Sequence, residues 1–494
     1  MLNTLIFNDS IIVFWDRIDL KKNEYYQLTL NGETVGTTAK THYTFSGLIP
    51  QTEYCIKLAL VCENGEKELD AISVTTQAAK SRIDITKPPY NAVSGGEVLN
   101  TVAIQKAIDD CGAGDCVYIP QGTFLSGALR LHSDMELYLD DGAVLLGSTQ
   151  VEDYLPKINS RFEGLEMQCL SSMINIGELD KNAGYTTKNV VIRGAGKIVG
   201  GGVELCQNVI DSETILLQEY LDSLGEKIQE YERADTIAGR VRPRLINVSN
   251  AQNVVICGVG IEKGASWNVH IIYSDNVVTC GCKFESFGIH NGDGWDPDSS
   301  TNCTIFNCRF DVGDDCVAIK SGKNPEGNII GKPCKNIKIF DCNSAKGHGV
   351  AIGSEISGGI DGVYIWDCNF EKSLCGLHIK TTKKRGGYVK NVFVDNSLLA
   401  SINIRTVHYN DDGESSNETT VFDNIALNNV YIAGIKYLDE ARNEPCNAIV
   451  IADQGFILKR VSMNNITIGD CQLTDIKDID SFSEVSLTNI TCVK

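Results

Sequence analysis

A short motif that recurs along the chain limits the folds it can adopt. The motif is an asparagine followed by alternating β-branched residues, and between residues 253 and 391 its starts lie 23, 26, 34, 26 and 29 residues apart. Short strands at such a period predict the coils of a right-handed parallel β-helix, because each coil buries its apolar side chains against its neighbours. An asparagine at one turn of each coil predicts a ladder of side-chain amides. The motif begins at Asn189, Asn253, Asn276, Asn302, Asn336, Asn391 and Asn465, with Gly362 in the same role.

The first 78 residues have a different pattern and predict a separate domain. Apolar and polar residues alternate in 25–30 and 54–60, and Asn31-Gly32 and Asn64-Gly65 are hairpin turn signals. This pattern predicts a small antiparallel β-sandwich. We therefore divide the chain into a sandwich over 1–78, a linker over 79–90 and a β-helix over 91–494.

Three further segments refine this organisation. Trp15 and the segment Leu48–Tyr54 resemble a fibronectin type III module, which implies a spacer or docking role. Residues 100–111 predict an amphipathic helix that covers an open end of the β-helix. Helical spacing near 211–240 predicts an insertion that leaves one coil and walls one end of a groove.

The composition argues against several function classes. The 64 acidic and 44 basic residues give a formal net charge of -20, which argues against nucleic acid as the main partner. No apolar run is long enough to span a bilayer, so no membrane partner is expected. The first residues lack the features of a secretory leader, and the 19 cysteines are scattered over strand-like stretches without zinc-site spacing. We expect free thiols and a cytoplasmic location, or secretion if a leader has been removed.

Two carboxylates, Asp314 and Asp315, stand side by side between strand-like stretches. Asp293 precedes them by 21 and 22 residues, about one coil, so the three acids are expected on neighbouring rungs about 4.8 Å apart. On an ideal strand Asp314 and Asp315 would face opposite ways, and Gly313 is expected to break the pleat so that both reach one groove. Such a cluster raises the pKa of at least one member, as a general acid requires. The alternative is a polar turn whose Asp side chains cap backbone N–H groups.

Two downstream clusters favour a catalytic interpretation. His348 stands between two glycines, which let a ligand come close to the backbone. In so acidic a chain, a cationic run without acids predicts an anion site, although a solvated charged loop is the commoner fate of such a run. The run contains His378, Lys380, Lys383, Lys384 and Arg385.

Four short motifs, taken in order, resemble those of the polygalacturonases of glycoside hydrolase family 28. They are N-x-D at 291–293, G-D-D at 313–315, G-H-G at 347–349 and the triplet at 378–380. The resemblance covers roughly residues 85–490. It implies a parallel β-helix enzyme that hydrolyses α-1,4 bonds of pectic oligosaccharides with inversion, and it implies no cofactor or metal. Bacterial exo-acting members are the most similar in the segments Ser160–Glu166, Arg242–Leu245, Asp315–Gly322 and Arg385–Gly387, and in a preceding fibronectin type III module.

The resemblance also implies a role for each motif residue. Asp314 would protonate the leaving oxygen, and Asp293 with Asp315 would activate the water on the opposite face of the sugar. His348 would support the protonation state of the acid, and Lys380 would hold a substrate carboxylate. The further substrate-binding candidates are Lys320, His378, Arg385 and Tyr409.

Two positions depart from the family pattern. Gly292 stands where threonine is usual, which leaves the neighbouring acid in place. His378 replaces the arginine of an Arg-Ile-Lys triplet, and a neutral imidazole cannot replace a bidentate guanidinium on a carboxylate. Either the substrate differs at that subsite, or Arg385 compensates, or activity is weak.

Two other functions remain open from the residues. A pectate lyase also uses a parallel β-helix, and Asp293, Asp296 and Asp298 could hold Ca²⁺ by composition, although without EF-hand spacing. A non-catalytic carbohydrate-binding β-helix is the third class. In the cytoplasm, an enzyme of this kind would meet short oligogalacturonides and trim them from one end.

Overall fold

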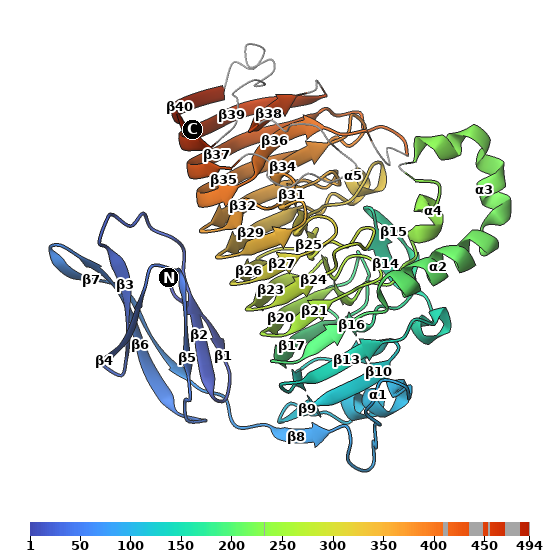
Figure 1. Ribbon diagram of the computed structural model, residues 1–494, viewed down its shortest axis with the longest axis horizontal. Helices are drawn as coiled ribbons and strands as arrows, with labels where there is room; N and C mark the ends of the chain where they lie inside the picture. Colours follow the sequence, from blue (N-terminus) through green and yellow to red (C-terminus); the bar gives the residue numbers. More distant parts are fainter. Residues whose placement is uncertain (232, 409–412, 434–447, 453–454, 470–484, 494) are drawn as a thin grey trace. The chain divides into compact units, whose positions relative to one another are not determined.

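The computed structural model describes residues 1–231, 233–408, 413–433, 448–452, 455–469 and 485–493. The chain divides into two compact units, residues 1–82 with 112–116, and residues 83–111 with 117–494 (Figure 1). No helix in these ranges is both long enough and apolar enough to cross a membrane.

The first unit contains two antiparallel sheets, one of β1, β2 and β5 and the other of β4, β3, β6 and β7. Both sheets contribute to one apolar core, in which the Trp15 ring meets the Tyr26 ring edge-on at 5.2 Å. The Ile49 N–H donates a hydrogen bond of 2.9 Å to the Tyr54 hydroxyl, which closes a corner of the chain. The strands are β1 (Asn3–Ile6), β2 (Ser10–Phe14), β3 (Tyr25–Leu30), β4 (Glu33–Thr38), β5 (His42–Ser46), β6 (Glu53–Cys62) and β7 (Gly65–Thr75).

The second unit is a parallel β-helix, which confirms the predicted fold class. One of its parallel sheets carries the candidate site and is called the groove sheet below. Its strands, in spatial and sequence order, are β11 (Leu129–Leu131), β16 (Ile174–Ile176), β19 (Ile246–Ser249), β22 (Val269–Ile272), β25 (Trp295–Asp298), β28 (Val317–Ile319), β31 (Val350–Ile352), β34 (Gly376–Thr381), β36 (Ser401–Thr406) and β38 (Ile449–Ala452).

The remaining faces of the coils form a second, larger sheet. Its strands are β8 (Ser81–Asp84), β9 (Asp115–Ile119), β10 (Gly122–Ser126), β12 (Met135–Leu139), β13 (Ala143–Gly147), β17 (Thr187–Gly194), β18 (Lys197–Val199), β20 (Ala251–Cys257), β21 (Gly260–Glu262), β23 (Asp275–Cys280), β24 (Lys283–Glu285), β26 (Thr304–Phe306), β27 (Arg309–Asp311), β29 (Cys334–Phe340), β30 (Asn343–Lys346), β32 (Ile360–Trp366), β33 (Asn369–Phe370), β35 (Tyr388–Leu399), β37 (Thr420–Ile432), β39 (Phe456–Gly469) and β40 (Val485–Val493). Stacked rings on successive coils strengthen this sheet, such as Phe306 on Phe340 at 4.8 Å and Phe340 on Trp366 at 4.4 Å.

The motif asparagines form the predicted ladder. The side-chain amide of Asn253 donates to Asn189 at 2.9 Å, and that of Asn276 donates to Asn253 at 2.9 Å. An aspartate replaces the asparagine as acceptor at two steps, because Asn302 donates to Asp275 and Asn391 donates to Asp361. These asparagines have φ between 53° and 59°, a left-handed conformation that asparagine tolerates better than most residues. Each repeat of the sequence motif therefore marks the place where one coil bends.

Helical segments lie at one end and beside the coils. The predicted cap helix is α1 (Thr101–Asp109), which buries Ile104, Ala107 and Ile108. The predicted helical insertion begins at Gly202, earlier than expected. It consists of α2 (Gly202–Leu216), α3 (Gln218–Leu224), η2 (Gly225–Glu230) and α4 (Thr236–Gly239), and the other short helices are η1 (Val151–Tyr154) and α5 (Glu326–Ile330).

Two insertions leave the β-helix at equivalent places. The antiparallel hairpin β14 (Ile158–Phe162) and β15 (Leu165–Cys169) leaves one coil just before its groove strand, β16. The helices α2 to α4 leave the next coil just before its groove strand, β19. Because β16 and β19 are parallel neighbours, the two insertions project from the same side of the groove sheet, and Figure 1 shows both there.

Candidate active site

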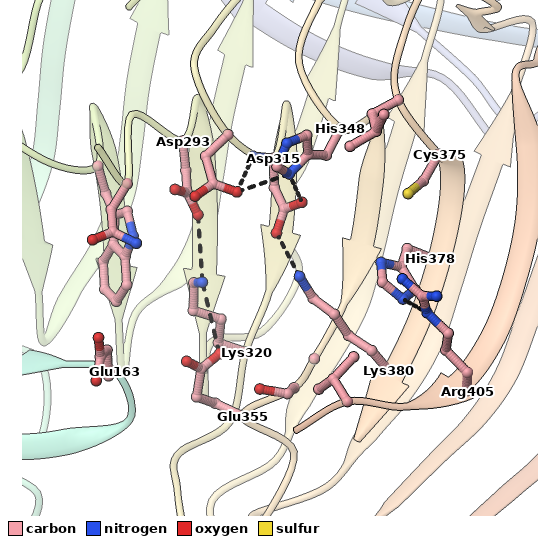
Figure 2. A pocket seen from close by; sticks show the side chains of 17 residues that line it. Glu163, Asp293, Asp315, Lys320, His348, Glu355, Cys375, His378, Lys380 and Arg405 are labelled. Atoms are coloured by element: carbon pink, nitrogen blue, oxygen red, sulfur yellow. Dashed lines mark hydrogen bonds and ion pairs between the residues drawn. The ribbon is translucent and has the colours of Figure 1, made fainter. Parts of the chain in front are cut away.

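The turn that precedes each groove strand carries the acids and His348. Asp293, Asp315 and His348 each lie two residues before the first residue of a groove strand, namely β25, β28 and β31. Because these strands are parallel neighbours in register, the three side chains stack on three successive coils. Figure 2 shows them side by side along one wall of a cleft.

Asp314 and Asp315 lie in the bend between β27 and β28, so neither belongs to a strand. The strand is interrupted between Asp311 and Val317, and both acids line the cleft as expected. A Cβ at Gly313 would lie 2.6 Å from the carbonyl oxygen of Ile289, so the glycine lets one coil approach the next. The same holds for Gly349, where a Cβ would lie 2.3 Å from the carbonyl oxygen of Gly376. Both glycines make room for the neighbouring backbone, whereas Gly349 was expected to make room for a ligand.

The imidazole of His348 joins the two adjacent acids. Its Nδ1 lies 3.0 Å from Asp314 Oδ1 and 3.5 Å from Asp315 Oδ1. Lys380 Nζ donates to the other carboxylate oxygen of Asp315 at 3.1 Å. The Asp314 side chain is 26% exposed and that of Asp315 is 4% exposed. Asp314 is thus the member of the pair that faces the open cleft.

The charges of this cluster set its protonation. Burial lowers the pKa of His348, but Asp314 and Asp315 outweigh it and raise that pKa to about 10. Burial raises the pKa of Asp314, and the His348 charge more than reverses this, so the pKa ends below its usual value. Burial acts the same way on Asp315, whose pKa Lys380 and then His348 bring far below its usual range. At neutral pH the cluster therefore holds an imidazolium between two carboxylates.

The carboxyl group with a raised pKa is that of Asp293, on the preceding coil. Burial, followed by the charges of Asp296 and Asp314, raises the pKa of Asp293 well above its usual value. Lys320 Nζ lies 3.5 Å from Asp293 and 3.7 Å from Glu355, and 4.4 Å above the Trp267 ring centroid. The member of the three-acid cluster with a raised pKa is thus Asp293, one coil from the pair, and not Asp314, which the resemblance makes the general acid.

The three acids proposed for calcium do not share a site. Asp293 faces Lys320, while Asp298 lies 2.7 Å from Arg161 Nη1. Both carboxylate oxygens of Asp296 are buried without a hydrogen-bond partner among the described residues, and burial raises the pKa of Asp296 well above its usual value. Acids that face separate counter-ions do not make an oxygen cage for Ca²⁺.

One group of ligand-type atoms in the described ranges has metal-like spacing. Asp314, Asp315 and His348 have one ligand atom each within 4.8 Å of one another. Because the pKa of His348 is raised, a metal would first have to displace the proton of its imidazole. The imidazolium itself accounts for the closeness of the two carboxylates.

The cationic run is only partly in the cleft. Lys380 and His378 line it, as Lys320 does from an earlier coil. Arg385 does not: it is 1% exposed, and its guanidinium donates to Asn324 Oδ1 at 2.6 Å and to the Ser354 carbonyl at 3.2 Å. Arg385 therefore cannot compensate for the missing arginine at 378.

Two other sequence expectations lie at the margin of the site. Tyr409 lies outside the described residues. At Gly292, a Cβ would lie 2.8 Å from the carbonyl oxygen of Ile289 and 2.9 Å from that of Ser286, so this loop has no room for the threonine usual at that position.

Four charged or aromatic residues of the cleft are additions to those singled out from the sequence. They are Glu163, Trp267, Glu355 and Arg405. Arg405 follows Lys380 by one coil, since the two pair across β34 and β36, and that coil spacing was a signal in the sequence. Glu163 had no comparable signal, because it reaches the cleft from the tip of the β14–β15 hairpin.

The β14–β15 hairpin borders the cleft beside Trp267. The Phe162 ring stacks on the Trp267 ring at 4.7 Å, and Arg244 lies over both rings. Arg240, from the end of the helical insertion, makes a hydrogen-bonded ion pair with Glu163 at 2.8 Å. The predicted wall is thus made by the hairpin, and the helical insertion holds the hairpin in place.

The chain has relatives among known proteins. The sequence profile described as Glycosyl hydrolases family 28 matches residues 176–491. An exo-poly-alpha-D-galacturonosidase of Dickeya chrysanthemi is 28% identical over 448 residues, 81% of this chain and 74% of the relative. A probable polygalacturonase of Vitis vinifera is 31% identical over 340 residues, 66% of this chain and 62% of the relative.

Solved structures share the fold. The exopolygalacturonase of Yersinia enterocolitica matches with a TM-score of 0.80 at 23% identity, over 99% of this chain and 96% of that one. The exopolygalacturonase of Thermotoga maritima matches with a TM-score of 0.67 at 23% identity, over 84% of this chain and 92% of that one.

Proposed function

This chain belongs to family 28 of the glycosyl hydrolases, and from that membership we propose that it hydrolyses α-1,4 bonds between galacturonate units of pectic oligosaccharides. The bond is cleaved with inversion, and the enzyme acts from a chain end. The cleft suits an anionic sugar, because Lys320, Lys380 and Arg405 line it in a chain with a formal net charge of -20.

The closed end of the cleft is the observation that carries the exo-acting mode. Glu163 lines the same cleft as the catalytic acids, and Gly164 beside it is packed against the Lys323 backbone. A polymer lying along the groove sheet would have to pass through this hairpin. The substrate therefore enters with one end against the hairpin, and cleavage removes a short piece of constant length.

The two adjacent acids divide the work by exposure and charge. Asp314 faces the cleft and carries the proton to the leaving oxygen. In the free protein this proton is on His348, 3.0 Å away, and the negative charge of a bound uronate favours its return to Asp314. His348 is thus the proton donor that reprotonates Asp314.

Asp293 is the general base that takes a proton from the attacking water. Its raised pKa makes it a stronger base than Asp315, whose pKa lies far below the usual range. Asp315 stays ionised, held by Lys380 at 3.1 Å, and orients the water. Acid and base come from different coils, and in an inverting enzyme the attacking water lies between them.

Digestion of an end-labelled hexagalacturonate tests the reaction and its mode together. We expect reducing ends to form, the first product to be the β-anomer by NMR, and one short product to be present from the earliest time. Early fragments of intermediate length would refute the exo-acting mode. An ultraviolet-absorbing unsaturated uronide would identify a lyase, and binding without any new reducing end would identify a non-catalytic protein.

The location and the first unit are part of the proposal. The described cysteines are free thiols, and Cys257 Sγ lies 3.2 Å from Cys280 Sγ without a bond, which favours a reducing compartment such as the cytoplasm. The Tyr54 corner and the Trp15 core favour a fibronectin type III-like spacer in the first unit. Cell fractionation with an antibody against the chain tests the location, and recovery only from the medium would refute it.

A further inference from the structure

Arg405 occupies a part of the cleft to which the family resemblance gives no role. It lies on β36 and pairs in register with Lys380 on β34, so its side chain starts one coil beyond the lysine that holds Asp315. Figure 2 shows its guanidinium beside the ring of His378, in the same cleft.

His378 holds this guanidinium by accepting a hydrogen bond. Arg405 Nε donates to His378 Nε2 at 3.2 Å. Burial, then the charges of Lys380 and Arg405, lower the pKa of His378 well below its usual value, so the ring is neutral and its Nε2 is free to accept. Because Arg405 donates this hydrogen bond from Nε, its two terminal nitrogens remain as a planar fork.

The charge of Arg405 has no carboxylate partner in the described part of the chain. Lys380 lies 3.1 Å from Asp315, and Lys320 lies 3.5 Å from Asp293. For Arg405 the described residues provide only the His378 contact. An unpaired guanidinium in the cleft of an acidic chain is a site for an anion from outside.

We propose that Arg405 is a specificity-determining residue that binds the carboxylate of a galacturonate unit, and that His378 is the positioning residue that aims it. The inference rests on the proposed function and names the group that selects its substrate. It also explains the histidine at position 378, because its ring accepts a hydrogen bond from a guanidinium supplied by the next coil. The missing arginine of the triplet is therefore replaced from β36, and Arg385 has no part in this.

Selectivity between a carboxylate and its methyl ester is the property to measure. The probes are trigalacturonate and fully methyl-esterified trigalacturonate, and their binding is measured by calorimetry in an Asp314→Asn background that prevents cleavage. We expect Arg405→Gln to weaken binding of the acid about 10- to 100-fold, the size of lost charge-assisted hydrogen bonds, and to change ester binding less than about twofold.

Three variants complete the design. Arg405→Lys keeps the charge but not the fork, and we expect it to recover only part of the loss. Adding His378→Arg to Arg405→Gln returns a guanidinium to the neighbouring coil and should restore acid binding. Lys383→Gln removes an exposed charge that does not line the cleft, and it should leave the ratio of acid to ester binding unchanged.

The outcomes separate this inference from the proposed function. If the wild type releases reducing ends and Arg405→Gln keeps its preference for the acid, Arg405 is not the selector. Equal weakening of acid and ester binding in Arg405→Gln and Arg405→Lys would reduce Arg405 to a structural part of the wall, which also overturns the inference. If the wild type binds trigalacturonate but never cleaves it, the hydrolase proposal fails while the binding comparison still decides the role of Arg405.

Discussion

His348 Nδ1 lies 3.0 Å from Asp314 Oδ1 and belongs to the next coil of the β-helix. This contact joins the most exposed acid of the site to a base whose pKa is raised to about 10. The proton that we propose for catalysis and part of the stability of the coils therefore depend on the same ion pair. Any change that neutralises one member must affect both properties.

Replacing His348 with glutamine should make stability less dependent on pH. The folded pKa of His348 lies above its usual value of 6.5, so its contribution is complete below pH 6.5 and is lost as the pH rises toward about 10. The pKa of Asp314 is lowered from 3.8, so its contribution is lost as the pH falls below that value. Both contributions are complete between pH 3.8 and pH 6.5, so the difference in Tm between wild type and variant should be greatest in that range. A constant difference across the whole range would contradict the ion pair.

Asparagine at position 293 should stabilise the fold while removing activity. A raised carboxyl pKa means that the ionised group costs stability above its usual pKa of 3.8, and this cost grows as the pH rises. We expect Asp293→Asn to raise Tm at neutral pH and to lower kcat about 10²- to 10⁴-fold, as loss of a general base does. Thermal scans at several pH values and initial rates measure the two effects.

Asp296→Asn is the matched control for that variant. Asp296 is equally buried and its pKa is also raised, but it does not line the cleft. It should raise Tm in the same way and keep most of the activity. Loss of kcat in both variants alike would show that the buried acids act as a group and that Asp293 has no separate role as base.

The spacing of the repeated sequence motif was enough to predict where the acids lie, but not where the walls of the cleft lie. Asp293 and Asp315 lie at the same point of successive coils, so their spacing along the chain gives their spacing in space. The same rule would have placed Arg405 beyond Lys380, but its strand, Ser401–Thr406, has no family motif and was passed over. Only the structure showed that a cation lay there.

Contacts between insertions could not be predicted from a period. Glu163 and Arg240 pair at 2.8 Å across 77 residues of chain, and each belongs to a segment that leaves its coil. Their meeting depends on how Phe162 packs on Trp267 and not on any repeat. The sequence therefore predicted a wall from the helical insertion alone, and the hairpin that makes the wall was missed.

Tyr54→Phe should weaken the first unit and leave the catalytic site unchanged. The variant removes the acceptor of the Ile49 N–H, a hydrogen bond worth about 1 kcal/mol. We expect an earlier unfolding transition for this unit in calorimetry and unchanged kcat on trigalacturonate. Tyr25→Phe, at a half-exposed ring of the same sheet, should change neither. A fall in kcat with Tyr54→Phe would contradict the spacer role.

Gly164→Ala should loosen the closed end of the cleft. Gly164 has φ of +78°, and a Cβ there would lie 2.6 Å from the Lys323 backbone nitrogen, so the tip of the β14–β15 hairpin must shift to accept a methyl group. Such strain costs about 1–3 kcal/mol, and a displaced hairpin opens the groove toward the earlier coils. We expect a lower Tm and the appearance of intermediate-length fragments from hexagalacturonate. Gly184→Ala, where a Cβ meets nothing within 4 Å, should keep the single short product. If Gly164→Ala lowers Tm and still releases only that product, the hairpin does not set the exo-acting mode.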